Sequence, residues 1–401
     1  MTCIKLIGTY LPPWQEGGRR LPGGDEDAVT MAVEAGRVLL ERAPGGGIER
    51  VVLVTRDLPL LEGGNGATLL AGLGLPSDLE VVERLGGAPA MLDAVLSARP
   101  RTLVLGADLD PAGAGAVLVS ADGTRLRPVS RIARSLPVTA RSRDGVMHDY
   151  DDPRLLRERG LKASLRQAGP EDKPFAVAGI PHGQMRGMCA GDPPRLPTLG
   201  ASATVFALAA MAEREEAGVL LASEQGTLTA VAIESAPAGT VHRLEPAGRP
   251  LPAARHTPGP EIPISLAAYD RAFEPKVRWE AARCGGCGAL AYPPRRRCRE
   301  CGSEGAWSPF PLPRRAEVYT AVTVRVPVPG LATPYSLAMV QLDGLDVRVL
   351  VRTTAAEAGT VAIGDTGRMT LRRVAVRSGV PDYGYAFWPD EPGEPDEEEV
   401  R

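Results

Sequence analysis

The chain has 401 residues, 44% of them hydrophobic, so it is long enough for two or three domains with their own cores. A formal net charge of −3 and an aromatic content of only 4% argue against a nucleic-acid binder. No apolar run approaches the roughly 20 residues of a membrane span. The N-terminal residues lack the pattern of a signal peptide, so we expect a reduced, cytoplasmic protein.

The first part of the chain alternates short apolar runs with segments of helical periodicity. The expected strands cover residues 3–8, 51–55, 79–83, 101–108, 113–119, 175–180, 218–223 and 228–233. The expected helices cover residues 28–36, 67–73, 88–98, 154–168 and 201–216. This alternation predicts a mostly parallel sheet with helices on both faces. Because it resumes after a polar, Arg-rich stretch at 121–170, it also indicates two related halves.

The rest of the chain has a different pattern. Residues 244–268 are rich in proline without periodicity, which predicts a linker after an α/β domain at 1–243. A helix and a cysteine-rich ribbon are expected at 269–310. Four or five short strands at 311–390 are typical of a small Greek-key barrel of the OB type. The acidic end, 391–401, is predicted to be disordered.

Four cysteines form two CxxC pairs that stand ten residues apart, namely Cys284, Cys287, Cys298 and Cys301. Four thiolates at about 2.3 Å close a tetrahedral zinc site, which is structural because no coordination position stays open. Glycines at 285, 286, 288 and 302 suit such knuckles, whose tight backbone needs positive φ or close approach to sulfur. Two disulfides or four unrelated thiols are the alternatives, and the spacing favours zinc.

Two family resemblances rest on these residues. The cysteine ribbon, the Tyr-Pro-Pro at 292–294 and the strands that follow resemble the acyl-CoA-associated OB-fold family with a rubredoxin-like zinc ribbon. The segments 8–12, 24–35 and 106–108 resemble the thiolase superfamily, nearest to microbial hydroxymethylglutaryl-CoA synthases. The second resemblance implies a five-layer α-β-α-β-α fold of two related halves, usually dimeric.

The thiolase resemblance implies a cysteine nucleophile at the start of the helix 88–98, a histidine and an acid/base glutamate. No cysteine lies between residues 4 and 188, and the pattern places Arg84 at the nucleophile position. A guanidinium cannot attack a thioester, because it stays protonated. Asp57 stands where the glutamate is expected, and His182 matches the histidine. The sequence therefore predicts a catalytically degenerate site.

Several of these residues have a second interpretation. His182 is either a retained catalytic histidine or a structural one. Arg84 either binds a carboxylate or a coenzyme A phosphate, or is a salt-bridged arginine. Cys189 is either a displaced nucleophile or a small buried thiol. Arg295 and Arg296 either contact coenzyme A phosphates or belong to a solvated face.

Together these patterns predict a non-catalytic subunit with a zinc-ribbon and OB module. It would support carbon–carbon condensation or thiolysis of acyl-CoA or acyl-carrier substrates by an active thiolase or ketosynthase partner. Structural zinc and a coenzyme A thioester are the expected ligands, and the chain is expected to be a homo- or hetero-oligomer. The alternative is an active hydroxymethylglutaryl-CoA synthase-like acyltransferase with a rearranged site, in which Cys189 or an unrecognised group is the nucleophile and works with His182 and Asp57.

Overall fold

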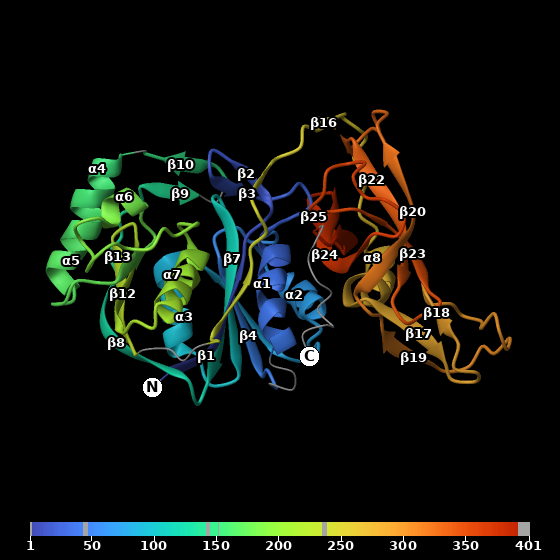
Figure 1. Cartoon of the computed structure of the whole chain (residues 1–401), viewed down its shortest axis with the longest axis horizontal. Helices are drawn as coiled ribbons and strands as arrows, with labels where there is room; N and C mark the ends of the chain where they lie inside the picture. Colours follow the sequence, from blue (N-terminus) through green and yellow to red (C-terminus); the bar gives the residue numbers. More distant parts are fainter. Residues whose placement is uncertain (1, 43–46, 142–144, 151, 235–238, 392–401) are drawn as a thin grey trace. The chain divides into compact units, whose positions relative to one another are not determined.

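The computed structural model describes residues 2–42, 47–141, 145–150, 152–234 and 239–391 (Figure 1). It divides into two compact units. The first consists of Met1–Pro22 with Asp27–Arg249, and the second of Gly23–Glu26 with Pro250–Arg401. Apart from Glu391, the predicted acidic tail lies outside the described residues. Within the described ranges, no helix has the length and apolar composition needed to cross a membrane.

The first unit is built on one ten-stranded sheet with the order β11-β12-β13-β8-β1-β7-β6-β4-β5, and β14 lies beside β1. The strands are β1 (Thr2–Tyr10), β4 (Arg50–Thr55), β5 (Glu80–Leu85), β6 (Thr102–Leu109), β7 (Ala112–Ser120), β8 (Thr124–Ile132), β11 (Ala176–Ala178), β12 (Gly218–Glu224), β13 (Thr227–Ile233) and β14 (Val241–Leu244). The unit also contains short strands and short helices: β2 (Trp14–Glu16), β3 (Arg19–Leu21), β9 (Thr139–Arg141), β10 (Met147–Asp149), α4 (Pro153–Leu155) and α6 (His182–Met185). Strand β15 (Arg249–Pro250) lies where the chain passes from the first unit to the second.

The expectation of a mostly parallel sheet is wrong, because the sheet is mixed. Among the described strands of this sheet, only the pairs β4–β5, β4–β6, β11–β12 and β1–β14 are parallel. The pairs β6–β7 and β12–β13 are antiparallel and follow each other through short turns. A parallel pair needs a longer crossover, which these turns do not provide.

Strand β8 joins the two halves of the sheet, since it pairs with β1 on one side and β13 on the other. It lies in the stretch 121–170, where the sequence analysis expected no strand. Its inward residues Thr124 and Leu126 are buried, whereas Arg125 and Arg127 are exposed. The exposed arginines gave this segment its polar composition.

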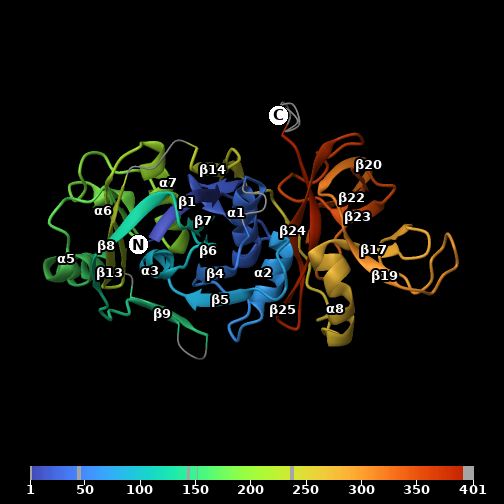
Figure 2. The ribbon, with the colours of Figure 1, turned by 90° about the horizontal axis from the view of Figure 1, so that it is seen from below.

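The helices of the first unit complete five layers (Figures 1 and 2). They are α1 (Ala28–Arg42), α2 (Asn65–Leu73), α3 (Ala88–Ser97), η1 (Leu156–Leu161), α5 (Lys162–Ala168) and α7 (Ala201–Glu213). Helices α3 and α7 pack against each other and against strands of both halves. Helix α1 covers β1, β6 and β7, with α2 beside it, and η1 and α5 cover β8, β12 and β13. The predicted α-β-α-β-α arrangement of two halves is confirmed.

The alternation of side chains along β11 separates two layers of the core. Ala176 and Ala178 belong to the cluster that contains α3 and α7. Val177, between them, belongs to a second cluster that contains Met185 and Cys189. Because successive side chains of a strand point to opposite faces, Cys189 lies on the outer face of this half of the sheet, away from α3.

Helix α1 begins where the sequence predicted, at the acidic residues of the segment 24–35. The backbone N–H of Thr30 donates to Asp27 Oδ1 (3.0 Å), and the N–H of Asp27 donates to Thr30 Oγ1 (2.8 Å). This reciprocal pair is a capping box with threonine in the third position, and it satisfies two N–H groups that the first helical turn leaves open.

The second unit contains a three-stranded ribbon and a five-stranded barrel. The ribbon strands are β17 (Glu280–Cys284), β18 (Leu290–Ala291) and β19 (Trp307–Pro311). The barrel strands are β20 (Arg315–Val324), β22 (Tyr335–Leu342), β23 (Arg348–Arg352), β24 (Thr366–Arg377) and β25 (Val380–Pro389). Other elements are β16 (Arg255–His256), α8 (Leu266–Phe273), η2 (Glu274–Arg278) and β21 (Ala332–Thr333). The order β23-β22-β20-β24-β25, closed by a bridge between Thr353 and Phe387, confirms the predicted OB-type barrel.

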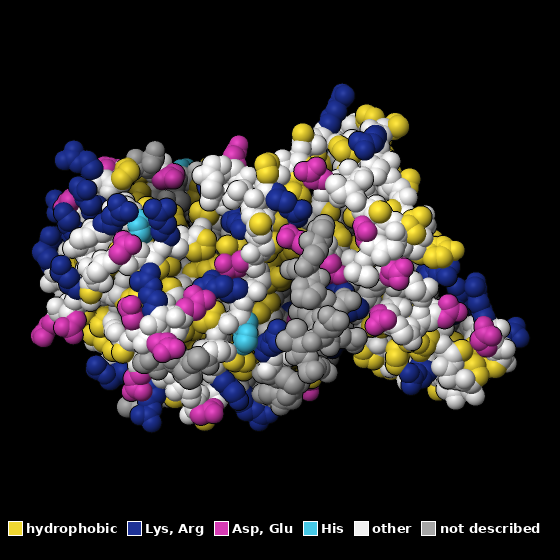
Figure 3. All heavy atoms as spheres, in the orientation of Figure 1, with side chains coloured by type: hydrophobic (Ala, Val, Ile, Leu, Met, Phe, Trp, Pro, Cys, Tyr) yellow, Lys and Arg dark blue, Asp and Glu magenta, His cyan; other side chains and the backbone are white. Residues whose placement is uncertain are grey.

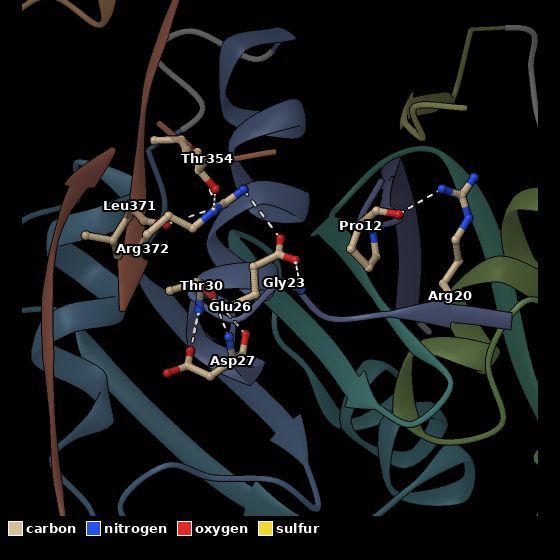
Figure 4. A network of polar contacts seen from close by, with 10 residues as sticks. Pro12, Arg20, Gly23, Glu26, Asp27, Thr30, Thr354, Leu371 and Arg372 are labelled. Carbon is tan, nitrogen blue, oxygen red and sulfur yellow. Dashed lines mark hydrogen bonds and ion pairs between the residues drawn. The ribbon is translucent and has the colours of Figure 1, made fainter. Parts of the chain in front are cut away.

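A buried ion pair lies within this second unit (Figure 4). Arg372 of β24 approaches Glu26 Oε1 to 3.4 Å, and the two side chains are only 1% and 2% exposed. Arg372 also donates to Thr354 Oγ1 (3.2 Å) and to the carbonyl of Leu371 (3.0 Å). The other oxygen of Glu26 accepts from the N–H of Gly23 (2.7 Å). Both charges therefore have partners, as buried ions require.

Candidate functional site

The N-terminus of α3 is the place where the thiolase resemblance puts a nucleophile. The structure has Gly87 as the N-cap there, followed by Ala88, and it places Arg84 three residues earlier, inside β5. The carboxylate of Glu224 lies against this helix end, where its Oε2 accepts from the N–H of Gly87 (3.2 Å). The other oxygen of Glu224 pairs with Arg56 at 2.5 Å. A carboxylate at this end of a helix is stabilised by the helix dipole.

The Glu224 carboxylate also fills the space at the N-terminus of α3. A Cβ built on Gly87 would lie 1.9 Å from Oε1 of Glu224, so a side chain at this position would displace the carboxylate. Glu224 itself is 22% exposed, because Arg56 covers one side of it from the loop after β4. The chain therefore supplies its own anion at the position where a thiolate is expected.

The N-terminus of α7 carries a second carboxylate. The oxygens of Asp108 accept from the N–H groups of Ala201 and Ser202, both at 2.8 Å, and from the hydroxyl of Ser202 at 2.5 Å. Burial raises the pKa of Asp108 to about 6, the hydrogen bonds from Ser202 and Ala201 oppose that rise, and the nearby charge of Asp57 adds to it.

Asp108 and Glu224 hold equivalent places in the two halves. Each stands near the end of a strand that leads into a hairpin, β6–β7 or β12–β13. Each caps the central helix of the other half, Asp108 on α7 and Glu224 on α3. The sequence analysis assigned neither role. Two local signals were present: a glutamate just before a Gln-Gly turn, and a Gly-Gly pair before a helix. No local sequence pattern indicates that these two segments are in contact.

Asp57 lies close to this region, but its hydrogen bonds are structural. Its Oδ2 accepts from the N–H of Leu109 (3.3 Å), and its own N–H donates to Thr55 Oγ1 (3.0 Å). These contacts fasten the loop after β4 to the end of β6. An acid/base role for Asp57 stays a prediction.

His182 begins α6, on the loop that leaves β11. This loop passes the start of α3, since a Cβ built on Gly179 would lie 3.3 Å from Cβ of Ala88. Both ring nitrogens of His182 are buried, and neither has a hydrogen-bond partner among the described residues. Within those residues, the structure therefore does not join His182 to Asp57. Its catalytic role stays a prediction.

Cys189 is a buried thiol in an apolar setting. It is 4% exposed and packs in one cluster with Val177, Ile180 and Met185. Burial raises the pKa of Cys189 to about 11, because the apolar surroundings disfavour the thiolate. This is the environment of a structural thiol rather than of a nucleophile.

Arg84 lines a cavity of about 440 Å³ together with Asp93 and Arg131. Asp93 Oδ2 lies 3.5 Å from Arg84 and 2.7 Å from Arg131, and Asp93 Oδ1 accepts from Thr229 Oγ1 at 3.0 Å. One carboxylate thus lies between two guanidinium groups. Arg84 is salt-bridged, and a contact with a coenzyme A phosphate stays a prediction.

The four ribbon cysteines form the candidate metal centre. The Sγ atoms of Cys284 and Cys301 are 3.7 Å apart, those of Cys287 and Cys298 are 3.6 Å apart, and all four lie within 4.8 Å of one another. A zinc–sulfur distance of about 2.3 Å requires sulfur separations near 3.8 Å in a tetrahedron. These separations fit zinc and far exceed the roughly 2.05 Å of a disulfide.

The backbone around the cysteines supports the same conclusion. Backbone N–H groups of Cys287 and Gly286 lower the pKa of Cys284 to about 7, whereas the pKa of Cys287 is raised, so the metal-site assignment rests on the sulfur separations. The knuckles close with Gly288 at φ 78° and Gly302 at φ 73°, as predicted for these two glycines. Gly285 and Gly286 are not among the residues with positive φ. A Cβ on Gly285 would lie 2.8 Å from the carbonyl of Ala306, so close packing accounts for that glycine.

The two arginines predicted to contact coenzyme A have different surroundings. Arg295 lines a cavity of about 180 Å³ at the junction of ribbon and barrel. Arg296 is exposed and is not among the residues that line this cavity. Their neighbour Arg297 donates to the carbonyl of Gly302 at 3.0 Å and so belongs to the second knuckle.

Two family models match the second unit. Residues 276–307 match the ChsH2 rubredoxin-like zinc ribbon domain, and residues 310–372 match the ChsH2 C-terminal OB-fold domain. Together they confirm the zinc ribbon and the OB-fold domain that the sequence predicted.

Three solved structures illustrate the likeness of the chain to known folds. 3-Oxoacyl-[acyl-carrier-protein] synthase III from Aquifex aeolicus VF5 is 17% identical with a TM-score of 0.45, covering 58% of this chain and 100% of that one. A variant of Xanthomonas campestris OleA is 13% identical with a TM-score of 0.49, covering 58% and 96%. The Ltp2-ChsH2(DUF35) aldolase is 22% identical with a TM-score of 0.26, covering 32% and 98%.

These matches are distant, and they concern the fold alone. The architecture of the first unit is established by its own five layers, and that of the second unit by its strand order and by the four cysteines. The chain therefore joins a five-layer α-β-α-β-α unit to residues that match the zinc ribbon and the OB-fold domain of ChsH2.

Proposed function

We propose that the chain is a non-catalytic subunit that supports carbon–carbon condensation or thiolysis of acyl thioesters by an active thiolase or ketosynthase partner. The observation that carries this proposal is the Glu224 carboxylate at the N-terminus of α3, held by Gly87 and Arg56. A thiolate there would need the same N–H groups and would be repelled by the carboxylate. The two anions therefore exclude each other.

The alternative is an active hydroxymethylglutaryl-CoA synthase-like acyltransferase with Cys189 as nucleophile. Cys189 packs in the outer cluster with Val177, whereas the N-terminus of α3 lies in the inner layer. With a pKa of about 11, its thiolate fraction at neutral pH is on the order of one in ten thousand. Placement and protonation both weigh against this alternative.

The second unit would then serve binding and assembly. In this proposal a coenzyme A or carrier-linked acyl thioester is bound rather than transformed, and Arg84, Arg295 and Arg296 are the proposed coenzyme A contacts. The chain would work in the cytoplasm as a homo- or hetero-oligomer with the active enzyme. The fusion of a condensing-type fold with domains of the ChsH2 type supports a shared task in acyl-thioester chemistry.

Intact mass after incubation with acetyl-CoA and with longer acyl-CoAs tests the proposal. We expect no acyl adduct on the zinc-loaded chain. The control is Cys189→Ala, which should likewise show no mass increase over its own unmodified mass. A stoichiometric adduct on the wild-type chain that is lost in Cys189→Ala would overturn the proposal and establish the alternative.

The proposed assembly has its own test. Made without its partner, the chain should pair with itself or be poorly soluble, because its partner-facing surface would be uncovered. Gel filtration at several concentrations measures this. A clean monomer at every concentration would contradict the assembly role.

A further inference from the structure

The cysteines of the ribbon differ in their access to solvent. Of the six cysteines in the chain, Cys287 and Cys301 are exposed, and the other four are buried. The buried ribbon cysteines, Cys284 and Cys298, are each only 4% exposed. Each CxxC pair therefore combines one buried sulfur with one that small reagents in solution can reach.

Each exposed sulfur lies beside a buried sulfur of the other CxxC pair. Sγ of Cys301 is 3.7 Å from Sγ of Cys284, and Sγ of Cys287 is 3.6 Å from Sγ of Cys298. A disulfide needs about 2.05 Å, so each pair has to close by roughly 1.6 Å. Disulfide formation by oxidation needs this arrangement, because an accessible sulfur reacts first and a neighbouring sulfur then completes the bond.

The surroundings of the exposed cysteines are positively charged. Residues 295–297 and Arg299 are arginines, and Figure 3 shows Lys and Arg side chains gathered at the ribbon end of the second unit. Arg297 is held next to Cys301, because its Nε donates to the carbonyl of Gly302 at 3.0 Å. Oxidants select accessible cysteines in electropositive surroundings. Cys189, which packs among apolar residues, lacks both properties.

We propose that Cys287 and Cys301 are oxidation sites, at which hydrogen peroxide converts the ribbon to the disulfides Cys284–Cys301 and Cys287–Cys298 and releases the zinc. A zinc ligand is already a thiolate, and the exposed thiolate attacks the peroxide. An S–O bond forms, the O–O bond breaks and hydroxide leaves. The buried sulfur then attacks the sulfenic sulfur, so that an S–S bond forms and a second hydroxide leaves. Each pair thus gives two electrons to one peroxide molecule.

The oxidised ribbon should be free of metal and still folded. Two cross-links between the CxxC pairs restrict the unfolded chain, which offsets part of the loss of zinc. The barrel should respond, because the ring of Tyr292 in the ribbon lies 5.4 Å from Trp279, whose ring lies 4.7 Å from that of Tyr385 in β25. The proposal goes beyond the proposed function and holds whether or not the first unit is catalytic.

Treatment of the full-length, zinc-loaded chain with hydrogen peroxide tests this proposal. A colorimetric chelator follows the released zinc, and thiol labelling identifies the cysteines that stay reduced. We expect the rate of zinc release to rise with the peroxide concentration, the ribbon thiols to disappear, and Cys3 and Cys189 to stay reduced. Dithiothreitol followed by zinc should restore the starting state. The control Cys189→Ala should release zinc at the same rate as wild type.

Peptide mapping distinguishes the possible disulfides. Trypsin separates Cys298 from Cys301, because it cuts after Arg299, and it leaves Cys284 and Cys287 together on a third peptide. The proposed disulfides join all three peptides into one species, and fragmentation of that species should pair Cys284 with Cys301. A disulfide within each CxxC pair would instead release the third peptide on its own, and that result would overturn the proposal, as would pairing of Cys284 with Cys298.

The stability of the oxidised form provides a second measurement. In calorimetry, the transition of the second unit should lie higher in the oxidised chain than in reduced chain stripped of zinc by a chelator. An oxidised transition at or below that of the stripped chain would count against the proposal. Retention of zinc at peroxide concentrations that oxidise free glutathione, or sulfinic acids that dithiothreitol does not reverse, would overturn it. None of these results bears on the acyl-adduct test of the proposed function.

Discussion

At the scale of single residues, the two helix-capping carboxylates decide what the first unit can do. Glu224 lies at the N-terminus of α3 and Asp108 at the N-terminus of α7, so the chain supplies its own anion to the N-terminus of each central helix. Arg56 neutralises Glu224, whereas Asp108 depends on hydrogen bonds alone.

Asp108 should make stability fall as pH rises. Its pKa of about 6 lies above the 3.8 of an ordinary aspartate, so the folded state binds the proton more tightly than the unfolded chain does. The free energy of unfolding should therefore decrease between about pH 4 and pH 6, by roughly 3 kcal/mol, and then stay level. Urea unfolding of wild type and Asp108→Asn at several pH values measures this, because the free energy of unfolding of wild type minus that of the non-titrating variant should fall by the same amount. Asp78→Asn, at an exposed position, is the control. If the free energies of unfolding of wild type and Asp108→Asn change equally with pH, the raised pKa of Asp108 is contradicted.

Arg372 should be among the most sensitive positions of the second unit. Arg372→Met leaves the Glu26 carboxylate buried without its cation, so we expect a loss of about 3–5 kcal/mol in the free energy of unfolding. Arg315→Met, whose pair with Asp390 is partly exposed, should cost at most about 1 kcal/mol. Chemical denaturation measures both. Similar losses in the two variants would show that burial does not govern the effect.

At the scale of elements, one aromatic cluster joins the ribbon to the barrel. The ring of Trp279 lies 5.4 Å from that of Tyr292 in the ribbon and 4.7 Å from that of Tyr385 in β25. Its Nε1 donates to the carbonyl of Pro313 at 3.0 Å. The ribbon and the barrel should therefore depend on each other for stability.

Trp279→Ala should lower the stability of ribbon and barrel together, by about 3–5 kcal/mol, because it leaves a large void between them. Trp279→Phe keeps most of the ring and loses the hydrogen bond to Pro313, so about 1 kcal/mol is expected. Near-ultraviolet circular dichroism during thermal unfolding records the loss, and zinc release reports on the ribbon. Zinc release at an unchanged temperature in Trp279→Ala would contradict the coupling.

At the scale of the whole molecule, two compact units share one chain. The first has its core around α3 and α7, and the second holds the four cysteines. A structural zinc site contributes its binding free energy to the unit that contains it. Metal removal should therefore act on one unit and spare the other.

Calorimetry with and without a chelator measures this difference. We expect two unfolding transitions, of which the chelator lowers only the one that belongs to the second unit. In the absence of chelator, Cys298→Ser should also lower the transition of the second unit. A single transition that shifts as a whole would show that the two units unfold together.

Much of the architecture is readable from local patterns. The strands at 51–55 and 228–233 and the helix that begins at Ala28 are present as predicted, because apolar periodicity and capping act over a few residues. The four cysteines identify the metal centre for the same reason: each CxxC pair forms its own knuckle. The sequence by itself determined most of the elements, the ribbon, the barrel and the absence of a cysteine between residues 4 and 188.

Only the tertiary structure decided how these parts meet. Glu224 and Gly87 are 137 residues apart, and Asp108 and Ala201 are 93 apart, so no local pattern joins them. Strand β8 was missed because its exposed arginines conceal its role as the link between the halves. Contacts between residues so far apart in the sequence depend on the chain topology and on several elements that bury the same site together. Neither can be read from a single sequence.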